Sequence, residues 1–172
     1  MPVCHLVIHA YGTWMPDRPE GYYHHALGYR EQDVDVADRY RERQAEPAAR
    51  FDVRAQRLLV QTLIDAAGPQ RLTIYAVASD EAHLHVLVGW TDGRTGDAVH
   101  DRLKQSLARG LNAAGPRRRW FVRKGWVERV SDEAHFGTLA EEYLPSHRGW
   151  GWHWRRGWIP PRGTDREPLA RG

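Results

Sequence analysis

The sequence has almost no cysteine and no long hydrophobic run. Cys4 is its only cysteine, which excludes an internal disulfide and a zinc site built from several thiolates. No apolar segment approaches the roughly 18 residues that a membrane-spanning helix needs, and the first residues lack the basic and then apolar pattern of a signal peptide. We therefore expect a cytoplasmic protein with no membrane segment, whose ten histidines are the main source of metal ligands.

Strong compositional bias is also absent. Hydrophobic residues make up 41% and charged residues 27% of the 172 positions, values that exclude wholesale disorder and predict one globular domain. Glycines and prolines interrupt residues 11–50, a stretch far longer than an ordinary connection. We therefore expect a single domain at 1–150 with a long insertion at about 11–50, followed by a C-terminal tail rich in tryptophan and arginine at 151–172.

The net charge of +3 conceals an uneven distribution along the chain. Residues 102–129 hold nine basic residues and one acidic residue, a net charge of +8, and residues 147–172 hold six and two, a net charge of +4. The rest of the chain therefore carries a net charge of −9. A local positive field of this kind favours binding to a polyanion, although basic runs also occur as solvated helix faces.

Hydrophobic periodicity predicts an alternation of strands and helices around the insertion. The predicted strands are residues 5–10, 72–78 and 84–90, with short strand candidates at 120–122 and 126–130. The predicted helices are residues 52–67 and 97–114, a short one at 34–43, and one that begins at Ser131-Asp132 and contains Tyr143. This order favours an α+β fold, the ferredoxin-like split βαβ plan, in which an antiparallel sheet carries helices on one face and leaves the other open for a site.

Two histidines lie at the start of a predicted strand. In His83-Leu84-His85 the two-residue period of a strand places Leu84 in the core and both imidazoles on one face, where we expect both rings to be exposed. Two neutral imidazoles on one face form half of a divalent metal site. The pattern by itself is weak, because a chain with ten histidines produces such a pair easily by chance.

Three further features accompany this pair, which matches a motif of histidine, hydrophobic residue and histidine. Tyr11-Gly12-Thr13 follow the first predicted strand, a helix that begins near Phe51 precedes the predicted hairpin, and the basic helix carries Lys104 and Arg109. In this order the features resemble the single-tyrosine HUH transposases of the insertion-sequence type, including REP-associated tyrosine transposases. The resemblance covers residues 3–150. It implies the HUH endonuclease fold, Mg²⁺ or Mn²⁺ as cofactor, single-stranded or hairpin DNA as partner, and a homodimer.

The resemblance also implies a catalytic tyrosine and a third metal ligand. Tyr143 matches the family's nucleophile, whose attack on DNA leaves a 5′-phosphotyrosine and a free 3′-hydroxyl, so the resemblance implies a metal-dependent single-stranded DNA endonuclease and strand transferase. His147 matches the ligand that joins the histidine pair. Pro145 predicts that the helix ends near Leu144 and leaves the direction of His147 open. The alternatives are a core aromatic for Tyr143 and a solvent-exposed histidine for His147.

Basic and aromatic residues form the candidate DNA-binding set. Cationic side chains bind phosphates, and aromatic rings stack on unpaired bases. The expected DNA-binding residues are Lys104, Arg109, Arg117, Arg118, Arg119, Arg123, Lys124, Trp150 and Trp152. For the tryptophans, an oligomer interface or a cover over the open face of the sheet is the alternative.

Other polar residues near the predicted site have simpler interpretations. Asp80 and Glu81 precede the histidine pair, where a carboxylate can reach a metal but where turn residues are also common. His5 and His9 share one face of the first strand, where they can border the site, but we expect them to pack or to contact DNA instead.

Two other functions stay open on the sequence alone. One is a catalytically inactive relative that binds hairpin or single-stranded DNA without cutting it. The other is an RNA-binding module on the same sheet plan, but its central strands should carry stacking aromatics, and this chain has Val86 and Val88 there.

Overall fold

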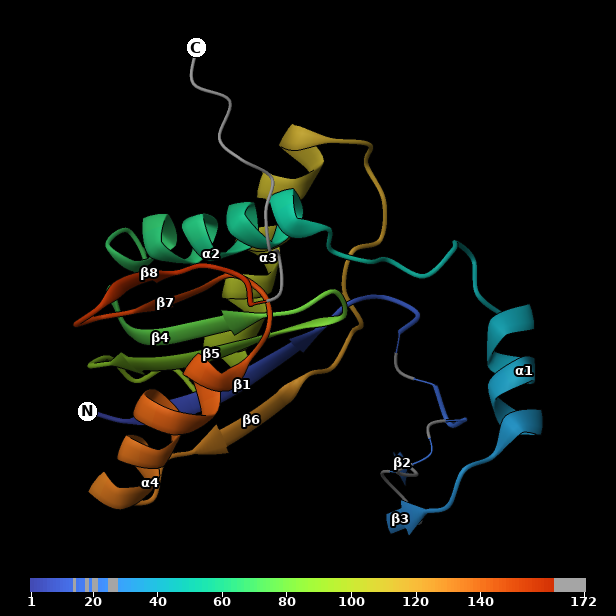
Figure 1. Cartoon of the computed structure of the whole chain (residues 1–172), viewed down its shortest axis with the longest axis horizontal. Helices are drawn as coiled ribbons and strands as arrows, with labels where there is room; N and C mark the ends of the chain where they lie inside the picture. Colours follow the sequence, from blue (N-terminus) through green and yellow to red (C-terminus); the bar gives the residue numbers. More distant parts are fainter. Residues whose placement is uncertain (14, 18, 20–21, 25–27, 163–172) are drawn as a thin grey trace.

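The structure, a computed structural model, describes residues 1–13, 15–17, 19, 22–24 and 28–162. Its centre is a six-stranded antiparallel sheet with the strand order β6-β1-β5-β4-β7-β8, so the fold is α+β (Figure 1). The strands are β1 (Val3–His9), β4 (Leu72–Ser79), β5 (His83–Trp90), β6 (Trp126–Arg129), β7 (Gly151–His153) and β8 (Gly157–Ile159). Of the short strand candidates, residues 120–122 form a single bridge, Ala10 with Phe121, instead of a strand.

Strand β5 shows how the two faces of the sheet differ. Leu84, Val86 and Val88 belong to the main apolar core, whereas Leu87 belongs to a second apolar cluster on the opposite face. His85 alternates with the same core residues and therefore shares the face of Leu87. The prediction that His83 and His85 share one face is thus confirmed by the alternation of the strand.

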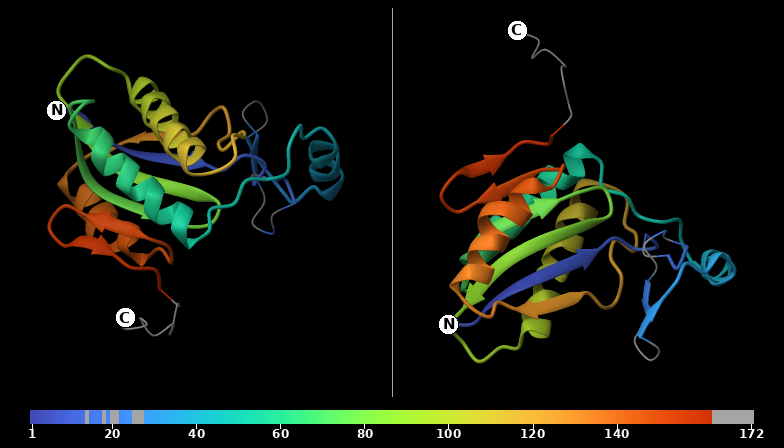
Figure 2. Two further views of the ribbon diagram at one scale, coloured as in Figure 1. Left: turned by 90° about the horizontal axis from the view of Figure 1, so that it is seen from above. Right: turned by 60° about the horizontal axis from the view of Figure 1, so that its bottom comes forward.

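Two long helices cover the core face of the sheet (Figure 2). They are α2 (Val53–Ala67) and α3 (Gly96–Ala114), and they confirm the helices predicted at 52–67 and 97–114. Asp52 and Thr95 cap their first turns by accepting hydrogen bonds from backbone N–H groups. Leu59 and Leu63 of α2 and Leu103 and Leu107 of α3 are fully buried against the sheet, where burying each side chain contributes about 1.5–3 kcal/mol.

The opposite face is not open, because a short irregular helix crosses it (Figure 2). Helix α4 (Glu133–Gly137) continues as a π-helical turn, Thr138–Tyr143, and a 3-10 turn, Leu144–Ser146. Leu139, Ala140 and Leu144 pack on a strip of apolar strand residues, Ala76, Ala78 and Leu87. The expectation that helices lie on one face only is therefore wrong for this segment, since the apolar strip needs a cover.

The insertion and the tail have different relations to the sheet. Within the insertion, β2 (Tyr22–His24) pairs with β3 (Gly28–Arg30), and α1 (Val34–Glu42) lies beside them, set apart from the sheet (Figure 1). Residues 151–159, expected as a tail, instead form β7 and β8 and extend the sheet from β4. The end of that expected tail, residues 163–172, lies outside the described residues. Within the described part of the chain, no helix is long and apolar enough to cross a membrane.

Candidate active site

Three histidines from two distant segments meet on the face crossed by the irregular helix. His83 and His85 lie on β5, and His147 follows the 3-10 turn. One ring nitrogen from each lies within 4.8 Å of those of the other two. The ring centroids of His85 and His147 are 4.5 Å apart. The structure therefore brings together the three histidines that we expected as metal ligands from the motif and the family resemblance.

Each of these rings uses its Nδ1 atom in a contact outside the cluster. Nδ1 of His83 lies 3.0 Å from the Asp80 carboxylate, and Nδ1 of His147 lies 3.0 Å from the carbonyl oxygen of Tyr143. Nδ1 of His85 lies 2.9 Å from Nε2 of His5. The contacts leave the Nε2 atoms available, and Nε2 of His85 is buried with no hydrogen-bond partner among the described residues. A ligating histidine held through its other nitrogen is the usual arrangement in metal sites.

Asp80 holds His83 from the turn between β4 and β5. One carboxylate oxygen accepts hydrogen bonds from the backbone N–H groups of Ala82 and His83, and the other contacts the His83 ring. Burial acts to raise the pKa of Asp80, but these hydrogen bonds outweigh it and lower the pKa to about 2. The next carboxylate, Glu81, forms an ion pair with Arg50 at 2.9 Å. Asp80 thus stabilises the turn and also orients the His83 ring.

His5 supports His85 from the neighbouring strand, a role that the sequence reasoning missed. Strand β1 pairs with β5, so the histidines of both strands share one face, and the His5 and His85 rings stack at 5.1 Å. Nδ1 of His5 lies 3.9 Å from the Glu128 carboxylate on β6. The available signal was that His5 and the histidine pair occupy the same face of strands that the predicted fold makes neighbours. Glu128, His5 and His85 form a row across three strands.

Burial keeps these two inner histidines neutral. His85 is 5% exposed, contrary to the expectation that both motif rings are exposed. Burial and the neighbouring histidines His83, His147 and His5 lower the pKa of His85 to about 2. Burial also lowers the pKa of His5, although Glu128 opposes this effect. A neutral imidazole is the form that binds a metal.

Tyr143 lies at the edge of the histidine cluster within the same chain. Its ring centroid is 4.9 Å from that of His147 and 5.5 Å from that of His85, edge-on in both cases. The residue is 43% exposed, so a molecule from solvent can reach its ring. Burial of the remainder, with a contribution from the Asp80 charge, raises the pKa of the phenol. The phenol is therefore protonated at neutral pH.

The irregular helix and the segment after it fix Tyr143 and His147. The π-helical turn ends at Tyr143, close to the helix end that Pro145 predicts, and after the 3-10 turn His147 adopts an extended backbone conformation. Beyond it the Gly149 N–H donates to the Ser79 carbonyl at 3.0 Å. A Cβ at position 149 would lie 2.2 Å from that oxygen, so only glycine permits this close approach. The approach anchors the segment after His147 to β4.

Part of the basic segment surrounds a cavity of about 730 Å³ beside α3. The arginines there stack on aromatic rings: the Arg118 guanidinium lies 5.4 Å from the Trp120 ring, and that of Arg119 lies 5.1 Å from Tyr11. Of the expected DNA-binding residues, the cavity is lined by Lys104, Arg118, Arg119 and Arg123. The remaining basic residues of the set, Arg109, Arg117 and Lys124, do not line it.

The two expected stacking tryptophans contact the protein itself. Trp150 and Trp152 are partly buried against the main apolar core. The Trp158 ring meets Trp150 edge-on at 5.7 Å, and the Arg57 guanidinium lies 5.4 Å from the Trp150 ring centroid. These contacts favour a structural role for Trp150. Trp154, 43% exposed, is more accessible.

No family model and no curated protein matches this chain. Among solved structures, it is similar to that of a REP-associated tyrosine transposase bound to a REP hairpin, with a TM-score of 0.46 and 8% sequence identity. The similarity covers 84% of this chain and 62% of the other, so the chain spans less than two thirds of that protein. It is a distant resemblance of fold, and it establishes neither the family nor the activity.

Proposed function

We propose that this protein is a metal-dependent single-stranded DNA endonuclease and strand transferase that acts through a 5′-phosphotyrosine intermediate on Tyr143. The observation that carries the proposal is the position of Tyr143, edge-on to His85 and His147 in a cluster of three histidines. A nucleophile beside a metal site is the arrangement that phosphoryl transfer requires. The strand order β6-β1-β5-β4, with α2 and α3 on one face, supports the ferredoxin-like HUH plan.

The histidine cluster fits a divalent cation. Nε2 of His85 is buried without a hydrogen-bond partner in the described part of the chain, and the Nδ1 contacts leave the other two Nε2 atoms available. His83, His85 and His147 would hold the ion. Imidazole nitrogens suit Mn²⁺ better than Mg²⁺, which prefers oxygen ligands. When bound, the ion would polarise the scissile phosphate.

Cleavage is one substitution at phosphorus, in which Tyr143 is the nucleophile. The Tyr143 oxygen forms a bond to the phosphorus while the bond from phosphorus to the 3′ oxygen breaks, which leaves a 5′-phosphotyrosine and a free 3′-hydroxyl. Because the pKa of Tyr143 is raised, the phenol starts protonated and gives up its proton to water as the new bond forms, and the leaving 3′ oxygen takes up a proton from water to become the hydroxyl. Attack by a 3′-hydroxyl reverses the step and joins strands, since the phosphotyrosine keeps the phosphodiester.

The basic cavity beside α3 is the proposed surface for the rest of the DNA. It lies at the segment Tyr11–Gly12, and the cavity next to the histidines lies at His9 and Thr13, so the two cavities adjoin the same stretch after β1. Single-stranded or hairpin DNA that contacts both cavities would therefore lie along residues 9–13. Tyr143 and the three histidines belong to one chain, so the site needs no second subunit, and the expected homodimer stays a prediction.

The test is covalent capture of DNA. Hairpin and single-stranded DNA labelled at either end are incubated with the protein and Mn²⁺ or Mg²⁺ and run on a denaturing gel. We expect a 3′ label to migrate with the protein and a 5′ label to appear on a shorter free strand, with EDTA preventing both. Mass spectrometry should map the adduct to Tyr143. No adduct with either metal on any hairpin would favour the catalytically inactive DNA-binding relative.

That alternative has less support from the geometry. A protein that has lost cleavage has no need for a phenol beside the metal ligands. Here the Tyr143 ring contacts two of the three candidate ligands, and a glycine with no space for a side chain anchors the following segment. This arrangement supports the enzyme over the inactive relative.

A further inference from the structure

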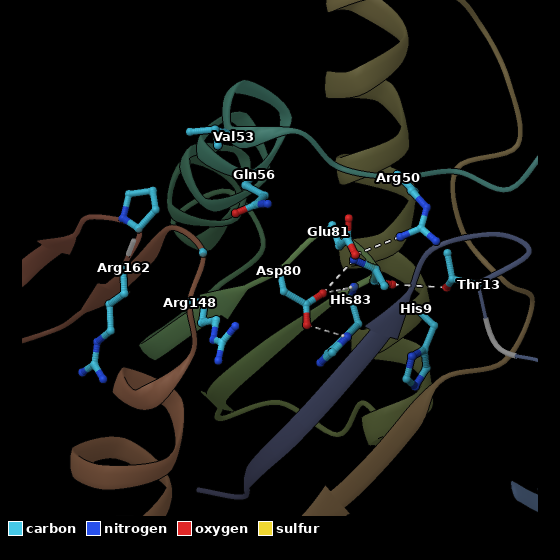
Figure 3. A pocket seen from close by; sticks show the side chains of 13 residues that line it. His9, Thr13, Arg50, Val53, Gln56, Asp80, Glu81, His83, Arg148 and Arg162 are labelled. Atoms are coloured by element: carbon cyan, nitrogen blue, oxygen red, sulfur yellow. Dashed lines mark hydrogen bonds and ion pairs between the residues drawn. The ribbon is translucent and has the colours of Figure 1, made fainter. Parts of the chain in front are cut away.

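A cavity of about 570 Å³ adjoins the histidine cluster on the side of α2 (Figure 3). Asp80 and His83 lie at its centre, and Arg50 lies on one side (Figure 3). Arg148 and Arg162 lie on the other side, with Arg148 between Arg162 and the Asp80–His83 pair (Figure 3). Cavities of this size accommodate small organic ligands. The cavity shares His83 with the proposed metal site, so a ligand in it would lie next to the reacting phosphate.

The charged groups around the cavity leave an unbalanced positive charge. Arg50 is paired with Glu81, and the Asp80 carboxylate is occupied by His83 and by backbone N–H groups. Arg148 and Arg162 are exposed and form no ion pair with any described residue. Two guanidinium groups without acidic partners in the described part of the chain favour an anion, and phosphate matches their forked geometry.

The backbone brings these two arginines to the same place. The Arg162 N–H donates to the Arg148 carbonyl at 2.7 Å, which ties the chain after β8 to the segment after His147. Gly149 is in turn packed against β4. Arg148 is therefore one residue from a candidate metal ligand and one residue from an anchored glycine, so its backbone is held next to the site.

The uncharged polar groups of the cavity are already used within the protein. Gln56 donates to the Phe51 carbonyl and accepts from the Trp150 N–H, and the Thr13 hydroxyl donates to the Ala10 carbonyl. The apolar lining comes from Val53 and Pro161. A base placed here would contact apolar surface and polar groups that already have hydrogen-bond partners. The cavity can therefore bind a phosphate but offers few hydrogen bonds that would distinguish one base from another.

We infer that this cavity is a nucleotide subsite, in which Arg148 and Arg162 bind the phosphate of one nucleotide in the strand next to the linkage attacked by Tyr143, without base preference. The inference rests on the proposed function for its substrate class. It adds a site outside the expected DNA-binding set, to which neither arginine belonged.

The experiment uses thymidine 3′,5′-bisphosphate and its deoxyadenosine counterpart, with thymidine as the uncharged probe. Calorimetry on the full chain should show binding of both bisphosphates with affinities within about threefold of each other and no binding of thymidine. Arg148→Ala and Arg162→Ala should each weaken binding at least tenfold. The affinity of Arg148→Lys should lie between those of the wild type and Arg148→Ala, because lysine keeps the positive charge but lacks the forked geometry of the guanidinium group. Arg39→Ala, an exposed arginine on α1, is the matched control and should bind like the wild type.

Circular dichroism melts of each variant verify the fold. Absence of bisphosphate binding in the wild type, equal binding by folded Arg148→Ala and Arg162→Ala, or a strong preference for one base would each overturn the inference. Tyr143→Phe should bind the bisphosphates normally. DNA adducts formed at the wild-type rate by both arginine variants would refute the subsite and leave the proposed function standing. Arginine-dependent bisphosphate binding without any adduct would support the subsite and remove the proposed nuclease.

Discussion

One face of the central sheet packs against α2 and α3 and is almost purely apolar, whereas the other carries histidines beneath a short irregular helix. On β5 the neighbours Leu84 and His85 are both buried, but Leu84 contacts the main core and His85 contacts His5 and His147. Apolar burial has no preferred direction, while a ring held through one nitrogen has a fixed orientation. Substitutions on the two faces should therefore affect different measurements.

The largest expected effect is that of Tyr143→Phe on the histidine face. It should abolish the covalent DNA adduct, because the attacking oxygen is gone. The melting temperature and the affinity for single-stranded DNA should change little, since the hydroxyl has no hydrogen-bond partner among the described residues. Denaturing gels, thermal melts and fluorescence anisotropy measure the three quantities. Tyr75→Phe on β4 is the matched control and should keep the adduct; an adduct that survives in Tyr143→Phe contradicts the assignment.

His83→Ala should remove one of the three ligands without unfolding the domain. The side chain of His83 is 26% exposed and belongs to neither apolar cluster, so its loss leaves the packing of both clusters intact. Mn²⁺ affinity measured by calorimetry should fall by more than about 100-fold, the upper range for loss of a supporting residue, and cleavage should cease. Unchanged Mn²⁺ affinity in a folded His83→Ala protein would exclude the histidine cluster as the metal site.

The adjacent substitution Leu84→Ala should lower the stability of the fold but leave Mn²⁺ affinity unchanged, the reverse of His83→Ala. Leu84 is fully buried in the apolar core, and a leucine-to-alanine change at such a site lowers the free energy of unfolding by about 2–5 kcal/mol. Urea denaturation measures this loss. The Mn²⁺ affinity of the protein that remains folded should be close to that of the wild type. If Leu84→Ala lowered metal affinity as much as His83→Ala, the two faces would not be separable.

A smaller effect is expected from His5→Ala, which tests whether the row of Glu128, His5 and His85 orients a ligand. Without His5 the Nδ1 atom of His85 loses its partner, and Mn²⁺ affinity should fall by about 10–100-fold. Glu128→Gln should have a weaker effect in the same direction, because it lies one step further from the ligand. Metal affinity unaffected by His5→Ala would make His5 a packing residue only.

The smallest expected effect is on the salt dependence of DNA binding. If Arg123 contacts a phosphate, Arg123→Ala should reduce the slope of log K against log salt by about 0.7, the value for one contact on a single strand. Anisotropy titrations at several salt concentrations measure the slope. Arg39→Ala should leave it unchanged, and a wild-type slope near zero would make the basic segment a solvated face.

The sequence by itself determined most of the regular elements. The apolar periodicity of residues 52–67 and 97–114 predicted α2 and α3, and the alternation around His83 and His85 predicted their shared face. Both follow from the local geometry of helix and strand, which depends on neighbouring residues. Pro145 predicted a helix end near Leu144, and the π-helical turn does end at Tyr143, but the regular α-helix already ends at Gly137.

Only the tertiary structure decided which residues surround the histidine pair and how they are oriented. The direction of His147 depends on Gly149 packing against β4, the role of His5 on the pairing of β1 with β5, and the place of Arg148 on its hydrogen bond to Arg162. Residues 151–159 became part of the sheet because β4 offered an edge on which they could pair. Each of these contacts joins residues far apart in the chain or depends on such a contact, and sequence periodicity carries no information about which distant segments meet.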